Sequence, residues 1–394
     1  MKIDILFTLS RLITTLVRPV FLIFIISFLK SDEESKIIAF IFTVGITFFQ
    51  FLSCDAHLNY YKDFFKKKTK HNLIFSYRSY INFCLGLCFL SFPVLAVVNF
   101  FFFKSVYLSF GVSLMIIFEK IMDEFNRFKI YTKDFRSWSK YVITMYFIPP
   151  FLATLFGLFS NYSISQIYIL ISLTVYFGLS VKLVTTLPLI LYPIKKMIMH
   201  TIEFYFSRIT FIIANVLHGH SIIVGRYFVL FYFEFFFSTY VALMSIMGII
   251  PTTIDMFYTA YRRKYFLSNP NEPFDILKAQ RFMILLFFSS MVTCLVCFIF
   301  LGNEIVAHLN IFHCLIFVCL LGIIYVCSLL FYESIFWIKT INDRILVDAF
   351  FYFFVLMFFL AIKLFSLDLF ITLILIFISM LLRTYALYYS LKSK

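Results

Sequence analysis

Charged residues are scarce in this chain, and their scarcity excludes a water-soluble protein. Only 14% of the 394 residues are charged and 62% are hydrophobic, whereas a soluble domain carries about 25% charged and about 45–50% apolar residues. A globule of this size cannot hide so much apolar surface, so the excess faces lipid. The composition therefore predicts an all-α integral membrane protein, because a helix satisfies its own backbone in lipid and an open sheet does not.

Motifs for catalysis and metal binding are also missing. The sequence contains no Gly-rich phosphate loop, nucleophile elbow or zinc-protease motif. Its eight cysteines lie in or beside apolar runs, where a thiol is a small hydrophobe, and Cys294 and Cys297 lack partners at zinc spacing. His218 and His220 have no evident third ligand. We therefore expect no enzyme activity, cofactor or metal.

Apolar runs long enough to cross a bilayer occur twelve times. A helix needs about 20 residues to span about 30 Å of hydrocarbon. Glu203 and Arg208 interrupt the seventh run, and the eighth is over-long and broken near Gly248 and Pro251. The first run has no small-residue cleavage site, so it is interpreted as a span and not as a signal peptide. The predicted spans lie near 7–29, 37–58, 80–103, 105–127, 140–160, 164–192, 201–218, 226–258, 282–301, 306–332, 345–363 and 367–390.

Lysine and arginine alternate from loop to loop. Cytoplasmic loops carry the excess of these residues, and here every even-numbered loop and the C-terminal end are basic, while the odd-numbered loops are short and poor in cations. The alternation predicts that both termini are cytoplasmic. The net charge of +14 is mostly this basic rim, which attracts anionic lipid head groups and needs no nucleic acid as a partner.

Two short patterns recur at equivalent spans. D-x5-Y-[KR] begins at Asp55 after the second span and at Asp255 after the eighth, and [FY]-E-x-I contains Glu119 in the fourth span and Glu333 in the tenth. Their shared order and orientation predict about twelve transmembrane helices in two six-helix bundles around a central cavity. The predicted N-terminal bundle is 1–196 and the C-terminal bundle is 197–394.

Cations within the spans predict the chemistry of that cavity. Arg11 and Arg18 are two helical turns apart on one face of the first span, Lys182 is the deepest cation of the sixth, and Arg208 lies in the seventh. Ionisable groups in a span usually face a bundle interior, and these four suit an anionic ligand such as a diphosphate. Alternatively, Arg11 lies at the membrane surface and Lys182 pairs with a carboxylate in the packed interior.

Acidic residues at the ends of spans predict either packing or gating. Glu119, Asp123 and Arg127 are spaced by four and share one helical face. They form either an ion network that ends the fourth span or a gate that closes in one state of a transporter. The quasi-symmetric counterparts of this cluster are Asp55, Asp255 and Glu333.

Glu234 is the best candidate for ion coupling. It and Asp348 lie within predicted spans, and a buried carboxylate can exchange a proton during transport. The alternative is that Glu234 only neutralises an arginine.

The whole chain resembles the polysaccharide-lipid flippases (Wzx-like proteins) of the multidrug/oligosaccharidyl-lipid/polysaccharide exporter superfamily. The resemblance rests on a length near 400, twelve spans, short outer loops, the cationic first span with Arg11 and Arg18, and the stretch Phe118 to Trp138. It implies alternating access that moves an undecaprenyl-pyrophosphate-linked oligosaccharide across the bacterial cytoplasmic (inner) membrane for O-antigen or capsule synthesis. Membrane lipids, a polysaccharide polymerase and chain-length proteins are the further partners that it implies.

Four alternatives remain. An O-antigen polymerase-type glycosyltransferase has a large outer loop with arginines, whereas no outer loop here exceeds about ten residues by the positive-inside assignment. A multidrug cation antiporter of the same fold predicts an acidic cavity, against the cations of the first and sixth spans. An insect-type chemoreceptor has seven spans, too few for the alternation. A non-transporting scaffold is the fourth alternative.

Overall fold

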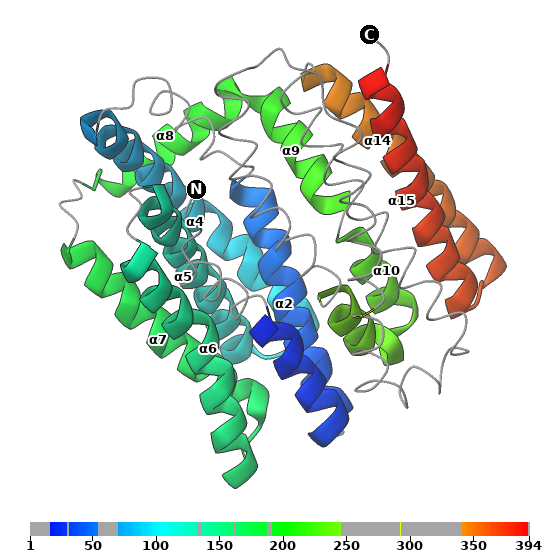
Figure 1. Cartoon of the computed structure of the whole chain (residues 1–394), viewed down its shortest axis with the longest axis horizontal. Coiled ribbons are helices and arrows are strands. Elements are labelled where there is room, and N and C mark those ends of the chain that lie inside the picture. The colour runs from blue at the N-terminus through cyan, green and yellow to red at the C-terminus, as the bar shows by residue number, and fades with distance from the viewer. Residues whose placement is uncertain are drawn as a thin grey trace. The chain divides into compact units, whose positions relative to one another are not determined.

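The computed structural model describes residues 16–29, 31–53, 70–131, 135–160, 162–186, 191–221, 223–245, 292 and 341–392. Every element in these ranges is a helix (Figure 1). Five helices are long and apolar enough to cross a membrane, or six if one bent pair counts as a single span. The protein is therefore helical throughout the described ranges, and its long apolar helices fit a membrane-embedded protein. The total of twelve spans in two bundles stays a prediction.

The chain divides into two compact units. Unit 1 comprises Met1–Val17 and Phe40–Gly219, and unit 2 comprises Arg18–Ala39 and His220–Lys394. The helix α2 (Asp32–Ser53) therefore contributes its first turns to unit 2 and the remainder to unit 1. The halves predicted from the sequence, 1–196 and 197–394, stay a prediction.

Unit 1 is built on α4 (Lys70–Phe103), α5 (Val106–Tyr131), α6 (Phe135–Phe159) and α7 (Ile164–Thr186). These ranges overlap the predicted third to sixth spans, because long apolar runs determine where such helices form. The turn between α4 and α5 is short, and its Lys104 adopts a positive φ of 51°. The pairs α4–α5, α5–α7 and α6–α7 pack together around buried aromatic side chains such as Trp138, Tyr168 and Tyr176.

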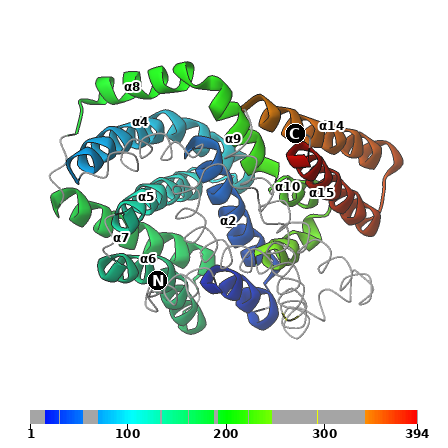
Figure 2. The ribbon, with the colours of Figure 1, turned by 45° about the horizontal axis from the view of Figure 1, so that its top comes forward.

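A sharp bend lies within the predicted seventh span in unit 1. The helices α8 (Ile194–Ser207) and α9 (Ile209–Ser221) meet there at 82° (Figure 2), so the predicted span over 201–218 is not one straight helix, and its crossing of the membrane stays a prediction. Arg208 lies at the break with φ −133° and ψ 28°, and its backbone N–H donates to the Tyr205 carbonyl. The interruption seen in the sequence at Arg208 is thus a change of direction.

Unit 2 contains η1 (Ile25–Leu29), α10 (Val224–Tyr232), η2 (Glu234–Phe236), a helix over 237–245, α14 (Ile341–Phe365) and α15 (Leu369–Lys392). The predicted eighth span, 226–258, is broken at Phe233, where φ is −138° and ψ is 56°. The break expected near Gly248 and Pro251 lies outside the described residues. A tight turn joins α14 to α15, and Asp368 Oδ1 caps α15 by accepting from the Ile371 N–H at 2.7 Å.

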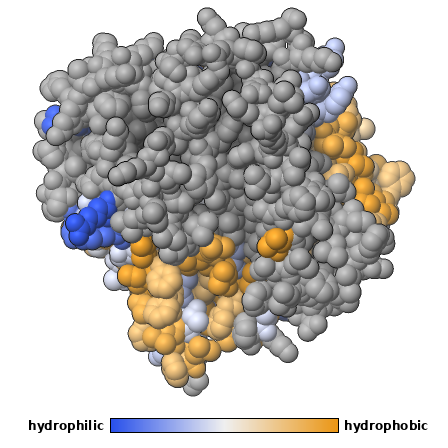
Figure 3. All heavy atoms as spheres, in the orientation of Figure 1, coloured by the Kyte–Doolittle hydropathy of each residue, from blue (hydrophilic) through white to orange (hydrophobic). Residues whose placement is uncertain are grey.

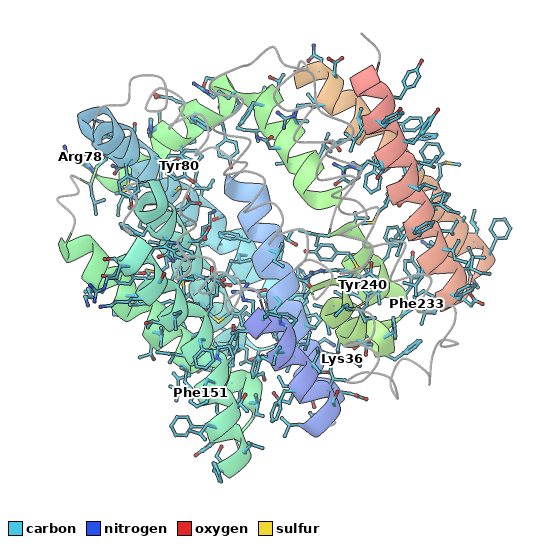
Figure 4. All side chains as sticks on the ribbon, viewed as in Figure 1. Lys36, Arg78, Tyr80, Phe151, Phe233 and Tyr240 are labelled. Atoms are coloured by element: carbon cyan, nitrogen blue, oxygen red, sulfur yellow. The ribbon has the colours of Figure 1, made fainter. Side chains whose placement is uncertain are left out.

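Apolar side chains cover the outward faces of both units. Figure 3 shows them over the exposed parts of α6 and α7 in unit 1 and of α14 and α15 in unit 2. Phe151 on α6 is 53% exposed and Phe353 on α14 is 58% exposed, and Figure 4 shows Phe151 pointing away from its helix partners. Large exposed apolar faces of this kind mark contact with lipid or a partner.

Candidate functional site

Only some of the predicted site residues lie in the part of the chain that the structure describes. Arg18, Glu119, Asp123, Lys182, Arg208 and Glu234 are described with their side chains. Arg127 belongs to α5, but its side chain is outside the description. The others lie outside the described residues: Arg11, Asp55, Asp255 and Glu333.

The predicted cations occupy different environments. Arg18 is half-buried and belongs to unit 2, whereas Lys182 and Arg208 are exposed and belong to unit 1. The Arg208 guanidinium lies 5.4 Å from the centre of the Phe204 ring, a distance at which a cation interacts favourably with an aromatic face. The binding role of these cations stays a prediction.

The interior of unit 1 holds a buried ion pair on α5. The Lys120 ammonium donates to Glu124 Oε1 one helical turn away, and the two side chains are 3% and 0% exposed. Glu119 is also buried, while Asp123 is half-buried. The sequence interpretation centred on Glu119, Asp123 and Arg127, but the described pair lies one position further along. Its spacing of four residues is the signal that could have found it.

Polar side chains of α4 lie near this pair. The thiols of Cys84 and Cys88 lie close enough to Lys120 and Glu124 for electrostatic interaction, and both cysteines are free and buried. The Tyr77 ring packs edge-on against the Phe125 ring of α5, with 6.1 Å between the ring centres. Unit 1 therefore combines charged, thiol and phenol groups in the buried region between α4 and α5.

A second polar contact lies further along the same two helices. The Asn99 side-chain amide donates to the Ser113 hydroxyl at 2.9 Å, and Ser113 in turn donates to the Ser109 carbonyl at 2.6 Å. All three residues are buried. Such contacts satisfy polar groups that would otherwise be costly in an apolar interior.

The interior of unit 2 holds an ion pair between α14 and α15. Arg383 donates to Asp348 Oδ1 from Nε at 3.0 Å and from Nη2 at 2.9 Å. The arginine side chain is 4% exposed and the carboxylate is fully buried. The other carboxylate oxygen, Oδ2, has no hydrogen-bond partner among the described residues. Arg344 is also buried one turn earlier on α14 and interacts electrostatically with Asp348.

Sequence reasoning noted Asp348 but missed Arg383. The partner is 35 residues away on the next helix, so no local spacing reveals the pair. A signal was nevertheless available, because a lone arginine inside an apolar run is costly in lipid and usually has an inward partner. The Arg383 guanidinium also lies 5.8 Å from the centre of the Phe351 ring, which adds to its burial.

Glu234 is exposed, which differs from the buried carboxylate expected for ion coupling. Its side chain is 67% exposed, and its Oε1 accepts from the Lys36 ammonium at 3.3 Å. The residue follows the helix break at Phe233. The buried contact nearby is that between the Ser35 and Ser238 hydroxyls at 2.9 Å.

No family model, curated protein or solved structure matches this chain. Its function is therefore inferred from its own residues. Within the described ranges, no group of three or more His, Cys, Asp or Glu side chains is arranged to hold a metal ion. The features that remain are the buried ion pairs within the helices of each unit, which can stabilise packing, bind a charged ligand or change partners during a conformational cycle.

Proposed function

We propose that this protein is a transporter that moves a lipid-diphosphate-linked oligosaccharide from the inner to the outer leaflet of the bacterial cytoplasmic membrane. The observation that supports it is that each unit buries a pair of ionisable side chains of opposite charge type within its helices. Lys120 pairs with Glu124 in unit 1, and Arg383 pairs with Asp348 in unit 2. Intramembrane ionic groups are expensive and mark the paths of charged substrates.

The chemistry of unit 2 favours an anionic head group over a cationic drug. Its described interior contains three arginines, Arg226, Arg344 and Arg383, and the planar guanidinium fork matches phosphate oxygens. With Arg18, which is half-buried in the same unit, they offer contacts for a diphosphate. The oligosaccharide would occupy a polar path while the lipid tail stays in the bilayer, and the two states of the transporter would expose that path alternately to each side.

The short connections favour transport over polymerisation. The turn between α4 and α5 and the turn between α14 and α15 each span only a few residues, and the positive-inside assignment places both on the outer side. The polymerase alternative predicts a large outer loop. The described outer turns are too short for this, so we propose a carrier and not an enzyme.

Removing the gene from the source bacterium tests this function. We expect the surface polysaccharide to disappear and the lipid-linked oligosaccharide to accumulate, because untransported units do not reach the outer leaflet. A polymerase defect differs, since single units would still reach the surface. The appearance of single units after gene removal would therefore contradict the proposal in favour of the polymerase.

Variants of Arg18 extend the same experiment to the binding chemistry. Arg18→Ala is expected to reduce the polysaccharide at least tenfold at an unchanged protein level. Arg18→Lys should restore part of it, because it keeps the charge but loses the bidentate fork. Lys104→Ala, which changes an exposed cation in the α4–α5 turn, is the matched control and should have little effect. Normal polysaccharide with Arg18→Ala would exclude this arginine from the path.

A further inference from the structure

The helix α8 has the geometry of a helix that lies in a membrane surface. Its 14 residues extend about 21 Å at about 1.5 Å per residue, less than the about 30 Å of a hydrocarbon core. The chain then turns by 82° into α9. A helix of this length, turned so far from the apolar helix that follows it, does not cross the bilayer by itself.

The contacts of α8 with α4 place it at one end of a candidate membrane span. Tyr192, just before α8, donates its backbone N–H to Asn82 Oδ1 at 2.8 Å, and the Thr201 hydroxyl donates to the Phe83 carbonyl at 3.1 Å. The span on α4 covers Tyr77–Phe103, and Figure 1 shows α8 passing across its N-terminal part. Phe83 lies about 30 Å from Phe103 along the helix, at about 1.5 Å per residue. The crossing is therefore about one hydrocarbon thickness from the α4–α5 turn.

Three faces of α8 differ in chemistry. One face packs on α4 through the buried side chains of Met197 and Thr201. A second face is exposed and apolar, with Met199 at 49% and Phe206 at 75% exposure. The third face is polar and carries Lys196, His200, Glu203 and Ser207. At 100° per residue, the polar face and the exposed apolar face lie side by side around the helix and share no residues.

Two lysines of α8 indicate the kind of surface that these faces can bind. Lys195 is exposed and falls in the same sector as Met199 and Phe206, where its long stem can lie along apolar tails while the ammonium reaches the head groups. Lys196 is exposed at the border of the polar face, 4.5 Å from the centre of the Tyr192 ring. Lysines beside an exposed apolar strip complement an anionic lipid surface.

We propose that α8 lies in the cytoplasmic lipid–water interface and binds anionic lipid head groups through Lys195 and Lys196. Met199 and Phe206 enter the acyl boundary, Glu203 faces water, and α4 fixes the depth of the helix. This docking surface is independent of the transported substrate, because it needs only the membrane and the described contacts of unit 1. The α8–α9 bend at Arg208 then lies where the chain leaves the interface.

Photo-crosslinking of the full-length chain in vesicles tests this assignment. A benzophenone amino acid replaces Met199, Phe206 or Glu203 in protein reconstituted into vesicles of phosphatidylethanolamine and phosphatidylglycerol, and adducts are identified by mass spectrometry. We expect lipid adducts at positions 199 and 206 to exceed those at position 203 by at least tenfold. Equal lipid labelling at the three positions, or labelling at 199 and 206 by protein instead of lipid, would overturn the proposal.

The lysines are tested by the composition of the captured lipid. Each lysine near an anionic surface contributes about 1 kcal/mol, which corresponds to an enrichment of anionic lipid of about fivefold. Lys195→Gln combined with Lys196→Gln should therefore lower the share of phosphatidylglycerol captured at position 206 by at least about fivefold. Lys104→Gln, an exposed lysine at the other end of α4, is the matched control and should leave that share unchanged. If the double variant captured the same share of phosphatidylglycerol as the wild type, head-group binding by these lysines would be contradicted. The position of α8 in the interface is tested separately by the labelling at positions 199, 203 and 206.

Discussion

Asp348→Ala is expected to destabilise the protein by about 3–5 kcal/mol, the cost of breaking a buried ion pair by removing one partner. The substitution leaves the Arg383 guanidinium, only 4% exposed, without the carboxylate that accepts from its Nε and Nη2. Buried Arg344 also loses the nearby negative charge. The measurement is the fraction of protein that stays folded after heating in detergent, compared with the wild type.

A matched control and a double variant give this prediction its specificity. Lys363→Ala removes an exposed cation from the same helix and should change stability by less than about 0.5 kcal/mol. Replacing the pair together, Asp348→Leu with Arg383→Met, should recover most of the lost stability, because apolar replacements of a buried pair are often neutral or stabilising. An Asp348→Ala variant as stable as the control would contradict the described pair.

The double variant also separates packing from transport. If the pair only holds α14 to α15, the stable apolar version should still move substrate. If Arg383 contacts the diphosphate or changes partners in the cycle, transport should be lost although the protein remains folded. We expect the second result, because the proposed function uses the arginines of unit 2.

Gly86→Ala is expected to loosen the contact between α4 and α8. A Cβ built at Gly86 would lie 2.6 Å from the Met197 carbonyl oxygen and 2.9 Å from its carbonyl carbon. These are backbone atoms, so α8 itself must move to admit one methyl group. Overpacking of this kind costs about 1–3 kcal/mol, which is measured as the change in unfolding free energy in detergent.

Gly178→Ala is the comparison for this substitution. Gly178 is on α7 of the same unit, and nothing lies within 4 Å of a Cβ built there. Alanine is the better helix former by about 1 kcal/mol, so this variant should be neutral or slightly more stable. Equal destabilisation by the two alanines would show that the effect comes from glycine in a helix and not from the α4–α8 contact.

The positions of the long helices could be read from the sequence, but their bends could not. The apolar runs predicted the helices α4 to α7, α14 and α15 because burial in lipid requires continuous hydrophobicity. The bend at Phe233 has neither proline nor glycine, the residues that usually mark a break. At Arg208 the charge was visible, but a charge in a span does not reveal whether the helix turns there or continues.

Whether each charged side chain points inward or toward lipid was harder to predict from the sequence. A helix that is hydrophobic all round has no polar side to identify the solvent, so sequence periodicity cannot separate lipid-facing from inward positions. The depth of Lys182 in α7 predicts an inward position, whereas its side chain is exposed in the structure. Arg383 was inward and paired, but its partner could not be found because it lies on another helix. The pair of Lys120 and Glu124 differs, because the two residues are one helical turn apart and their spacing is visible in the sequence.

Transbilayer movement of a lipid-diphosphate sugar in proteoliposomes is the direct test of the proposed transport. The purified full-length protein is reconstituted with a fluorescent lipid-diphosphate disaccharide, and an impermeant quencher reports the fraction left in the inner leaflet over time. We expect the protein to accelerate exchange at least tenfold over protein-free vesicles, and free diphosphate lipid to compete. Exchange no faster than in empty vesicles, with protein shown to be folded and inserted, would contradict the proposed function.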